Sequence, residues 1–366
     1  MTGIYIHVPF CKRKCPYCAF YSVAENDTLI EGYMSALKRD ISRYERDVTA
    51  DTVYFGGGTP SLLGADRIKD ILETVHKAFV IHNAEITLEC NPCTVDKNEL
   101  SGLISAGVNR LSVGVQSLDD KELAFLGRLH DAQRARQVIS DAVKAGFENV
   151  SADLMIGIKG QTKESLKRTV SQLHDLGVSH ISAYMIKAEH GTPFDSEKYL
   201  SQLMDDDSSA ELYLALDEVC RNFGFERYEI SNFARKGFES RHNLKYWKLE
   251  EYIGFGPSAH SYVGGKRLYT EPSVERYISA DAPELKVSDD APDPAEEYVM
   301  LGLRLREGID LAKAVSLGMT ESQRSRAERF AEQCSKSGLC VYSDGNIRLT
   351  AKGMLVSNSI ITGLLS

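Results

Sequence analysis

Six short runs of β-branched and aromatic residues alternate, along the first half of the chain, with longer stretches that have the amphipathic period of a helix. The runs are Ile4–Val8, Thr52–Phe55, Glu85–Leu88, Arg110–Val115, Val150–Met155 and His180–Ile186. The helical stretches between them include Leu29–Tyr44, Ala65–Phe79, Gln133–Ala145 and Lys163–Leu176. Strands that alternate with helices indicate βαβ units and a parallel sheet. The pattern therefore predicts an α/β fold whose six units form an open, partial (βα)6 barrel.

The second half of the chain has a different pattern. Residues 241–267 are rich in glycine and aromatic residues, and residues 281–295, rich in Asp, Pro and Ala, are typical of a linker. Farther on, Leu339–Tyr342 and Asn346–Thr350 flank Asp344-Gly345, a pair that suits a two-residue hairpin turn. We expect three parts: a barrel over residues 1–235, a middle region and linker over 236–290, and a small helical, winged-helix-like domain over 291–366.

Composition narrows the class of protein. Hydrophobic residues make up 43% and charged residues 26% of the chain, and the net charge is −9. An acidic chain is poorly suited to bind phosphates through lysine and arginine, so we expect no nucleic-acid partner. No apolar run reaches the roughly 18 residues needed to span a bilayer, and Ile4–Val8 is a core strand rather than a signal peptide. We expect a cytoplasmic protein, in whose reducing surroundings the eight cysteines favour metal or redox chemistry.

Three cysteines lie in a turn-prone loop directly after the first predicted strand. Cys11, Cys15 and Cys18 have the spacing C-x3-C-x2-C. Three thiolates from one loop can hold three irons of a [4Fe–4S] cluster. The fourth iron then lacks a protein ligand, and the amino and carboxylate groups of S-adenosylmethionine (SAM) can chelate it.

A structural zinc site is the alternative for this loop. Such a site normally closes with four ligands, so His7, Cys90 or Cys93 would have to supply the fourth. The spacing directly after an N-terminal strand favours the cluster, and we interpret Cys90 and Cys93 as packing residues. The loop also contains three basic residues, Lys12, Arg13 and Lys14. They are either solvated, or they offset the charge of the cluster, or they contact an electron donor.

Polar residues follow several of the other predicted strands. Gly56-Gly57-Gly58-Thr59-Pro60 comes after the second strand, where glycines allow a ligand to approach the backbone unless they form a plain turn. Glu89 ends the third strand, and a buried carboxylate there is costly unless it is paired. Gln116, Arg128 and Asp153 lie at or soon after later strands. Because α/β barrels carry their chemistry at the carboxyl ends of the strands, we predict one polar rim.

Taken together, these segments resemble a known family. Tyr5–Cys11 (YIHVPFC), Gly56–Pro60 (GGGTP) and Gly114–Ser117 (GVQS) are similar to radical SAM proteins related to oxygen-independent coproporphyrinogen III oxidase. Within that group, His242–Trp247 (HNLKYW) and the glycines after Tyr252 resemble the HemW family of haem chaperones. The resemblance spans nearly the whole chain.

The resemblance implies what the predicted rim binds. It implies a [4Fe–4S] cluster on the three cysteines, SAM, and haem as a third bound group. The SAM contacts carried over by matching motifs are Tyr5, Gly57, Gly58, Thr59, Glu89, Gln116, Arg128 and Asp153, with Lys187 as a backbone contact beyond the sixth strand. The partners implied are an electron donor and membrane respiratory proteins that accept haem, so the chain would work at the membrane surface. No catalytic residue is assigned.

Two departures bear on the subfamily. The cysteine motif of the oxidases resembles C-x3-C-x2-C-x-C, whereas Phe20 occupies the position of the fourth cysteine in this chain. They also carry a long N-terminal extension, for which a first strand near residue 3 leaves no room. Both differences favour haem handling, and decarboxylation of coproporphyrinogen III is the alternative.

His242 is the predicted axial haem ligand. Neutral imidazole commonly ligates haem iron, and Tyr246 and Trp247 could stack on a flat macrocycle. The alternative is that these residues pack the barrel and His242 bonds a backbone carbonyl; the resemblance favours haem. His260 and Cys220 are lesser candidates.

Overall fold

A curved parallel sheet forms the centre of the molecule, in a computed structural model that describes residues 1–44 and 46–366. Its six strands are neighbours in chain order and all run parallel. They are β1 (Thr2–Val8), β4 (Thr49–Gly57), β5 (Val80–Cys90), β6 (Arg110–Gln116), β7 (Asn149–Ile156) and β8 (His180–Met185). This order confirms the predicted partial barrel of six βα units.

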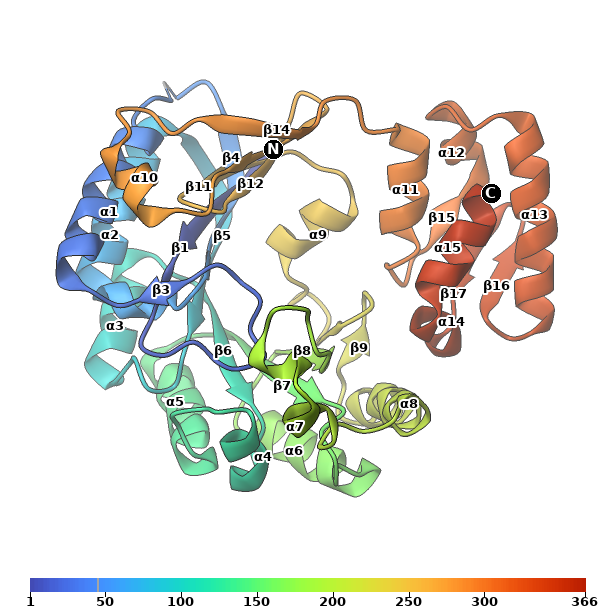
Figure 1. Cartoon of the computed structure of the whole chain (residues 1–366), viewed down its shortest axis with the longest axis horizontal. Coiled ribbons are helices and arrows are strands. Elements are labelled where there is room, and N and C mark those ends of the chain that lie inside the picture. The colour runs from blue at the N-terminus through green and yellow to red at the C-terminus, as the bar shows by residue number, and fades with distance from the viewer. Residues whose placement is uncertain (45) are drawn as a thin grey trace.

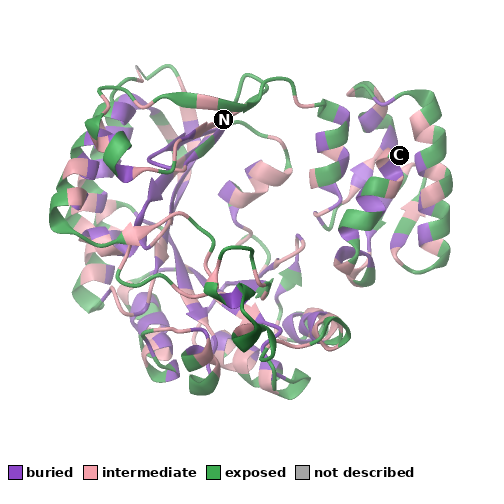
Figure 2. Cartoon of the chain, in the orientation of Figure 1, coloured by how far each residue is buried: buried purple, intermediate pink, exposed green. Residues whose placement is uncertain are grey.

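Helices cover the outer face of this sheet (Figure 1). They are α1 (Asp27–Ile41), α2 (Gly64–Ala78), α3 (Lys97–Ala106), α4 (Asp120–Phe125), α5 (Ala132–Ala145), α6 (Lys163–Asp175) and α8 (Asp206–Asn222). Figure 2 shows that the strands are largely buried and that the helices expose only their outward faces. The amphipathic stretches of the sequence therefore cover the sheet, as their period predicted.

The two faces of the sheet differ in polarity. One row across five strands is entirely apolar and buried: Ile6, Phe55, Leu88, Leu111 and Val150. The adjacent row, one residue earlier on each strand, places Tyr5 beside Tyr54, Tyr54 beside Thr87, and Thr87 beside Arg110. Since successive side chains of a strand point to opposite faces, the apolar row lies under the helices and the polar row faces the interior of the barrel.

Further strands extend the sheet beyond both ends of the barrel. β11 (Tyr252–Phe255) pairs with β1 in parallel, and β12 (His260–Val263), β13 (Lys266–Thr270) and β14 (Leu285–Asp289) follow as antiparallel strands. At the other end, β10 (Asn232–Ala234) pairs with β8, and β9 (Glu226–Arg227) pairs with β10. A Cβ on Gly254 would lie 2.1 Å from the carbonyl oxygen of His260, so this glycine permits the tight turn between β11 and β12.

The predicted linker over residues 281–295 is wrong in part, because β14 lies within it. Its Asp, Pro and Ala residues flank a five-residue strand whose pairing with β13 the composition did not reveal. The division of the chain at residues 235 and 290 stays a prediction.

The C-terminal unit packs helices against a small sheet and lies on the right in Figure 1. Its helices are α11 (Pro294–Gly302), α12 (Leu311–Ser316), α13 (Glu321–Lys336), α14 (Ala351–Leu355) and α15 (Ser357–Leu365), and its strands are β15 (Ile309–Asp310), β16 (Cys340–Ser343) and β17 (Asn346–Leu349). Asp344 and Gly345 both have positive φ, at 51° and 80°, in the turn between β16 and β17. The predicted hairpin is therefore confirmed.

Among the described residues, no helix is long and apolar enough to cross a bilayer.

Helix α9 (Arg241–Trp247) lies in the open side of the curved sheet, between the barrel and the C-terminal unit (Figure 1). The buried carboxylate of Glu85 accepts hydrogen bonds from the backbone N–H groups of Arg241 and His242, at 3.2 and 3.1 Å. A carboxylate at a helix N-terminus satisfies donors that have no partner inside the helix. Glu85 thus anchors α9 to the barrel.

We predict that Glu85→Ala destabilises the chain, because the two N–H donors at the start of α9 lose their buried acceptor. The free energy of unfolding should fall by about 1–3 kcal/mol for each donor left unsatisfied. Urea unfolding followed by circular dichroism measures the change. Glu73→Ala, on the exposed face of α2, is the matched control and should change little. Equal stability of the two variants would contradict the anchor.

Candidate functional site

A cavity of about 520 Å³ opens at the carboxyl ends of the barrel strands. Its lining brings together predicted site residues from distant parts of the sequence. They are Cys11, Cys15, Cys18, Gly57, Gly58, Thr59, Glu89, Gln116, Arg128, Asp153 and Lys187. The strand-end rule predicted their proximity, since the carboxyl ends of parallel strands meet at one edge of the sheet.

The three cysteines lie on one loop between two short paired strands, β2 (Phe10–Cys11) and β3 (Val23–Ala24). Neighbouring side chains hold two of the thiols: Thr59 Oγ1 donates to Cys11 Sγ at 3.6 Å, and Arg128 Nη1 donates to Cys15 Sγ at 3.4 Å. All three thiols are partly exposed to the cavity.

The donor set of this loop fits an iron–sulfur cluster better than a single ion. Within residues 1–44 and 46–366, no three His, Cys, Asp or Glu side chains converge on a point where one metal ion could bind. A cubane cluster needs one thiolate on each of three different irons, and so requires sulfurs that are apart from one another. Cys11, Cys15 and Cys18 line the cavity from one loop, as the ligands of three irons would.

Gly57 and Gly58, at the end of β4, lie in close contact with other residues of the same chain. A Cβ on Gly57, whose φ is 110°, would lie 2.7 Å from the ring of His7, and a Cβ on Gly58 would lie 2.6 Å from the carbonyl oxygen of Phe10. Larger residues would therefore push β1 and β2 away before they met any ligand. Both glycines also line the cavity, and the close approach of a ligand to their backbone stays a prediction.

Two buried carboxyl groups reach the cavity from the interior of the barrel. Glu89 accepts hydrogen bonds from Tyr54 Oη at 2.9 Å and from the backbone N–H of Gly57 at 3.2 Å. Burial, with the nearby charge of Asp153, raises the pKa of Glu89 to about 7. Burial likewise raises the pKa of Asp153 to about 6, although Ser112 donates to it at 3.0 Å. These carboxyls are therefore poised to gain from a cationic or hydroxyl-bearing ligand.

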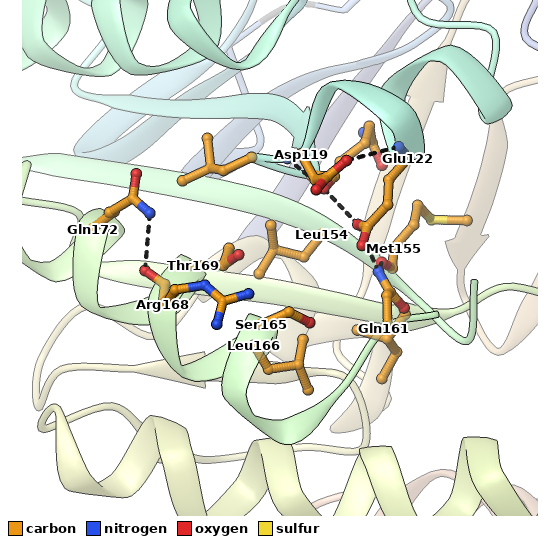
Figure 3. Close-up of a pocket in the computed structure, with 14 residues that line it drawn as sticks. Asp119, Glu122, Leu154, Met155, Gln161, Ser165, Leu166, Arg168, Thr169 and Gln172 are labelled. Carbon is orange, nitrogen blue, oxygen red and sulfur yellow. Dashed lines mark hydrogen bonds between the residues drawn. The ribbon is translucent and has the colours of Figure 1, made fainter. Parts of the chain in front are cut away.

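The loop after β6 is held in an unusual conformation. Gln116 has a φ of 65°, a left-handed conformation that is uncommon for a residue with a side chain. Directly after it, Ser117 Oγ donates to Glu122, and Gln161 Nε2 donates to the same carboxylate oxygen at 2.9 Å. Figure 3 shows Glu122 and Gln161 meeting across a smaller cavity, of about 80 Å³, which Gln116 also lines.

Gln161 extends this connection to the next strand of the barrel. Its side-chain oxygen accepts from the N–H groups of Gly157 and Ile158, at 2.8 and 3.0 Å. Glu122 and Gln161 thereby tie the loop after β6 to the loop after β7. The sequence analysis missed both residues, because their role depends on a contact between two loops 39 residues apart.

The sequence analysis also missed apolar residues of the cavity lining. Met155, Tyr184 and Met185 line the cavity at the ends of β7 and β8, and Phe20 lines it from the cysteine loop. The strand-end rule predicts the first three, because they end β7 and β8, but their apolar side chains carry no signal of a ligand.

Tyr5 does not line the cavity. Its half-buried ring is stacked on Tyr54, and its hydroxyl pairs with His7 Nδ1 at 3.1 Å. Tyr5 as a SAM contact stays a prediction.

His242 also lies outside the cavity, fully buried on α9. Its Nδ1 pairs with Thr52 Oγ1 at 2.8 Å, and its Nε2 pairs with Tyr246 Oη at 2.7 Å. Burial lowers its pKa to about 3, so the ring is neutral. Both ring nitrogens are thus engaged within the fold, and His242 as axial haem ligand stays a prediction. Of the lesser candidates, Cys220 is buried in the core, and His260 is exposed and stacked on Tyr269.

We predict a pH dependence of stability that depends on Glu89. Its pKa is raised from 4.5 to about 7 on folding, so the folded chain holds this proton more tightly than the unfolded chain. The resulting stabilisation is complete below pH 4.5 and is lost as the pH rises through about 7. Glu89→Gln should therefore flatten the decline of the urea midpoint over this range, measured on ligand-free protein. Identical pH profiles for wild type and variant would refute the assignment.

Comparison with known proteins identifies the family. Residues 5–173 match the family model of the radical SAM superfamily, and residues 289–356 match that of the HemN C-terminal domain. The haem chaperone HemW of Mycobacterium tuberculosis is 35% identical over 99% of this chain and 94% of its own length, and that of Bacillus subtilis is 32% identical over 100% and 99%. The mitochondrial radical S-adenosyl methionine domain-containing protein 1 of Bos taurus is 32% identical over 100% of this chain and 87% of its own.

Among solved structures, coproporphyrinogen III oxidase (HemN) of Escherichia coli superposes with a TM-score of 0.84, over 100% of this chain and 90% of that one. At 19% identity this likeness establishes the fold, from the partial barrel to the C-terminal unit. The curated relatives, matched at higher identity over nearly the full length of both chains, establish the family. The chain belongs to the HemW family of radical SAM proteins.

Proposed function

We propose that this chain is a haem chaperone, which carries a [4Fe–4S] cluster and SAM in its barrel cavity and passes haem to membrane respiratory haemoproteins. The observation that supports the proposal most is the common cavity. Three thiols from one loop and polar side chains from four strand ends line it, in a chain that belongs to the HemW family. The names of the curated relatives supply the cargo, which is haem.

The cysteine loop would hold the cluster. Cys11, Cys15 and Cys18 would each ligate one iron, and the guanidinium of Arg128, 3.4 Å from Cys15 Sγ, would favour the thiolate form by its charge. When bound, a cluster with an open iron supplies a site that chelates SAM and can transfer an electron to it. Thr59, which donates to Cys11 Sγ, would help to fix the orientation of the loop.

The remaining cavity residues would hold SAM. Glu89 and Asp153 would accept from its ammonium and ribose hydroxyl groups, because both carboxyls are buried and gain from a cationic or donor partner. Gln116 would bind it from the loop that Glu122 and Gln161 stabilise. Gly57, Gly58 and the backbone of Lys187 complete the proposed lining.

An electron donor and a haem acceptor are the proposed protein partners. Lys12, Arg13 and Lys14 form an exposed basic segment within the cysteine loop, on a chain whose net charge is −9. Such a segment would attract an acidic electron donor close to the cluster. A cytoplasmic location next to the membrane that holds the acceptor stays a prediction.

Coproporphyrinogen III oxidase is the second candidate function. The fold of the E. coli oxidase is shared, but a fold does not carry a function. Phe20, which lines the cavity in place of the oxidases' fourth cysteine, favours the chaperone.

We predict that the cluster depends on the cysteine loop alone. Anaerobically reconstituted protein should hold about four irons and four sulfides, with a brown charge-transfer absorption. Replacement of Cys11, Cys15 and Cys18 together by Ala should abolish both. The matched control replaces Cys90 and Cys93 by Ala and should keep the iron, because burial raises the pKa of Cys90 to about 12 and keeps it a thiol. Iron retained by the triple variant would refute the cluster assignment.

The two candidate functions differ in turnover. We predict that reconstituted protein binds a single haem per chain, and that it releases no carbon dioxide from coproporphyrinogen III when SAM and a reductant are present. Haem titration followed by absorption, and a decarboxylation assay under anaerobic conditions, measure the two. Robust release of carbon dioxide would overturn the chaperone in favour of the oxidase.

A further inference from the structure

His242 has a different partner on each of its two ring nitrogens. Nδ1 pairs with Thr52 Oγ1 at 2.8 Å, and Nε2 pairs with Tyr246 Oη at 2.7 Å. Thr52 lies on β4 in the barrel, whereas Tyr246 lies on α9 itself, four residues after His242. Residues four apart lie on the same side of a helix, which brings the Tyr246 hydroxyl to the imidazole. One contact therefore ties α9 to the barrel, and the other lies within α9.

Aromatic neighbours hold the imidazole ring in one plane. Tyr54 stacks on His242 with 5.1 Å between the ring centroids and 28° between the planes, and Tyr5 stacks on it at 6.3 Å and 28°. The ring of Tyr246 meets the imidazole edge-on, at 5.1 Å and 89°. Because burial lowers the pKa of His242 to about 3, the ring is neutral. One of its nitrogens therefore carries a proton and the other has a lone pair to donate.

The contact with Thr52 is of the kind that supports a metal-ligating histidine. Such a histidine almost always donates its second ring N–H to a fixed acceptor, which orients the ring. Thr52 Oγ1 is an acceptor of this kind for Nδ1, since it is fully buried on a strand. Nε2 is then the nitrogen with the lone pair for iron, and Tyr246 occupies that position.

Tyr246 is the partner that can leave. It is half-buried, as is Trp247 beside it, whereas Thr52 is fully buried. Within residues 1–44 and 46–366, His242 is the hydrogen-bond partner of its hydroxyl, and no other is present. Burial holds the pKa of that hydroxyl well above its usual value, so it stays a phenol rather than the phenolate that ligates iron. Tyr246 can therefore leave Nε2 with the loss of a single hydrogen bond.

We propose that Thr52 and Tyr246 are positioning residues for the haem ligand: Thr52 orients His242 through Nδ1, and the Tyr246 hydroxyl covers Nε2 until haem displaces it. This inference rests on the proposed function and on His242 as its axial ligand. The hydrogen bond from Tyr246 and the haem iron compete for the same lone pair. This competition weakens haem binding and favours release, which suits a chaperone that must give up its cargo.

A second buried histidine has the same kind of surroundings and serves as a comparison. Ser151 Oγ pairs with Nδ1 of His180, and Tyr228 Oη pairs with its Nε2, both at 2.8 Å. His180 differs in that it lies on β8, a strand that is paired on both sides. Tyr228 also accepts from the backbone N–H of Ser240 next to α9, so Ser151 is the cleaner position for a control.

The decisive experiment is haem titration of reconstituted full-length protein, followed by absorption. Tyr246→Phe should bind haem about two- to tenfold more tightly, because one competing hydrogen bond is removed. The spectrum of its bound haem should match that of the wild type, since the axial ligand is the same. In ligand-free protein, the same variant should unfold at a lower urea concentration, because buried Nε2 loses its partner. A purely structural role of Tyr246 would instead weaken both haem binding and stability.

Thr52 should act in the opposite direction. Thr52→Val removes the acceptor for Nδ1 at nearly unchanged volume and should weaken haem binding by about tenfold or more. Thr52→Ser keeps the hydroxyl and should bind haem almost as the wild type does. This pair tests the proposal even if Tyr246→Phe does not fold.

Two control variants remove comparable contacts elsewhere. Ser151→Ala removes the hydroxyl on Nδ1 of His180. Tyr33→Phe removes a buried tyrosine hydroxyl that donates to the carbonyl oxygen of His7 at 2.8 Å. Both should lower stability and leave haem affinity unchanged. Weaker haem binding in Ser151→Ala, with no change in Thr52→Val, would assign the ligand to His180 and overturn the inference.

The outcomes separate the two levels of the proposal. Wild-type protein that binds no haem would overturn the chaperone function itself. Haem binding with an unaltered spectrum in His242→Ala would leave that function standing and would overturn the inference together with its ligand. Haem binding that depends on His242, but is unchanged or weaker in Tyr246→Phe, would overturn the covering role of Tyr246.

Discussion

A fully buried arginine inside the barrel is the constraint on which the rest of the structure depends. Arg110, at the start of β6, is 1% exposed. Burial alone would lower the pKa of its guanidinium, but the charge of Glu85 and other neighbours raises that pKa above its usual value. A charge in such surroundings is tolerated only among opposite charges and hydrogen-bonding groups. The side chains that face the interior of the barrel must therefore be polar. For this reason apolar and polar residues alternate along its strands.

The polar interior in turn requires a cover on its open side, and α9 provides it. Glu85 accepts from the first N–H groups of this helix, and His242 reaches Thr52 on β4. Lys245, on the same helix, pairs with Asp51 and Glu250, both at 2.8 Å. The histidine and tyrosine of the HNLKYW segment thus pack into the barrel wall.

The cavity at the other end of the barrel is organised by contacts between loops. Arg128 joins the cysteine loop to β6, through Cys15 Sγ and the carbonyl of Gly114. Glu122 and Gln161 join the loops after β6 and β7. Side chains that bind ligands are effective when a second layer of contacts fixes them, and these residues form that layer.

The sequence by itself determined the elements and the chemistry of the loops. The six βα units followed from hydrophobic period, the hairpin from Asp344-Gly345, and the cysteine loop from its spacing. The meeting of Glu89, Gln116 and Asp153 in one cavity also followed, because parallel strands end at a common edge. All of these features depend on the local pattern of residues along the chain, or on the parallel strand order that this pattern implies.

Tertiary structure alone decided the role of single side chains. His242 pairs with Thr52, which lies 190 residues away in the sequence, only because the fold brings α9 against β4. The close contacts of Gly57 with His7 and of Gly58 with Phe10 arise only in the fold, and β14 exists because β13 offers it an edge. The physical reason is the same in each case. A side chain's hydrogen-bond partners and exposure are set by segments that pack against it, and sequence spacing carries no record of which segments those are.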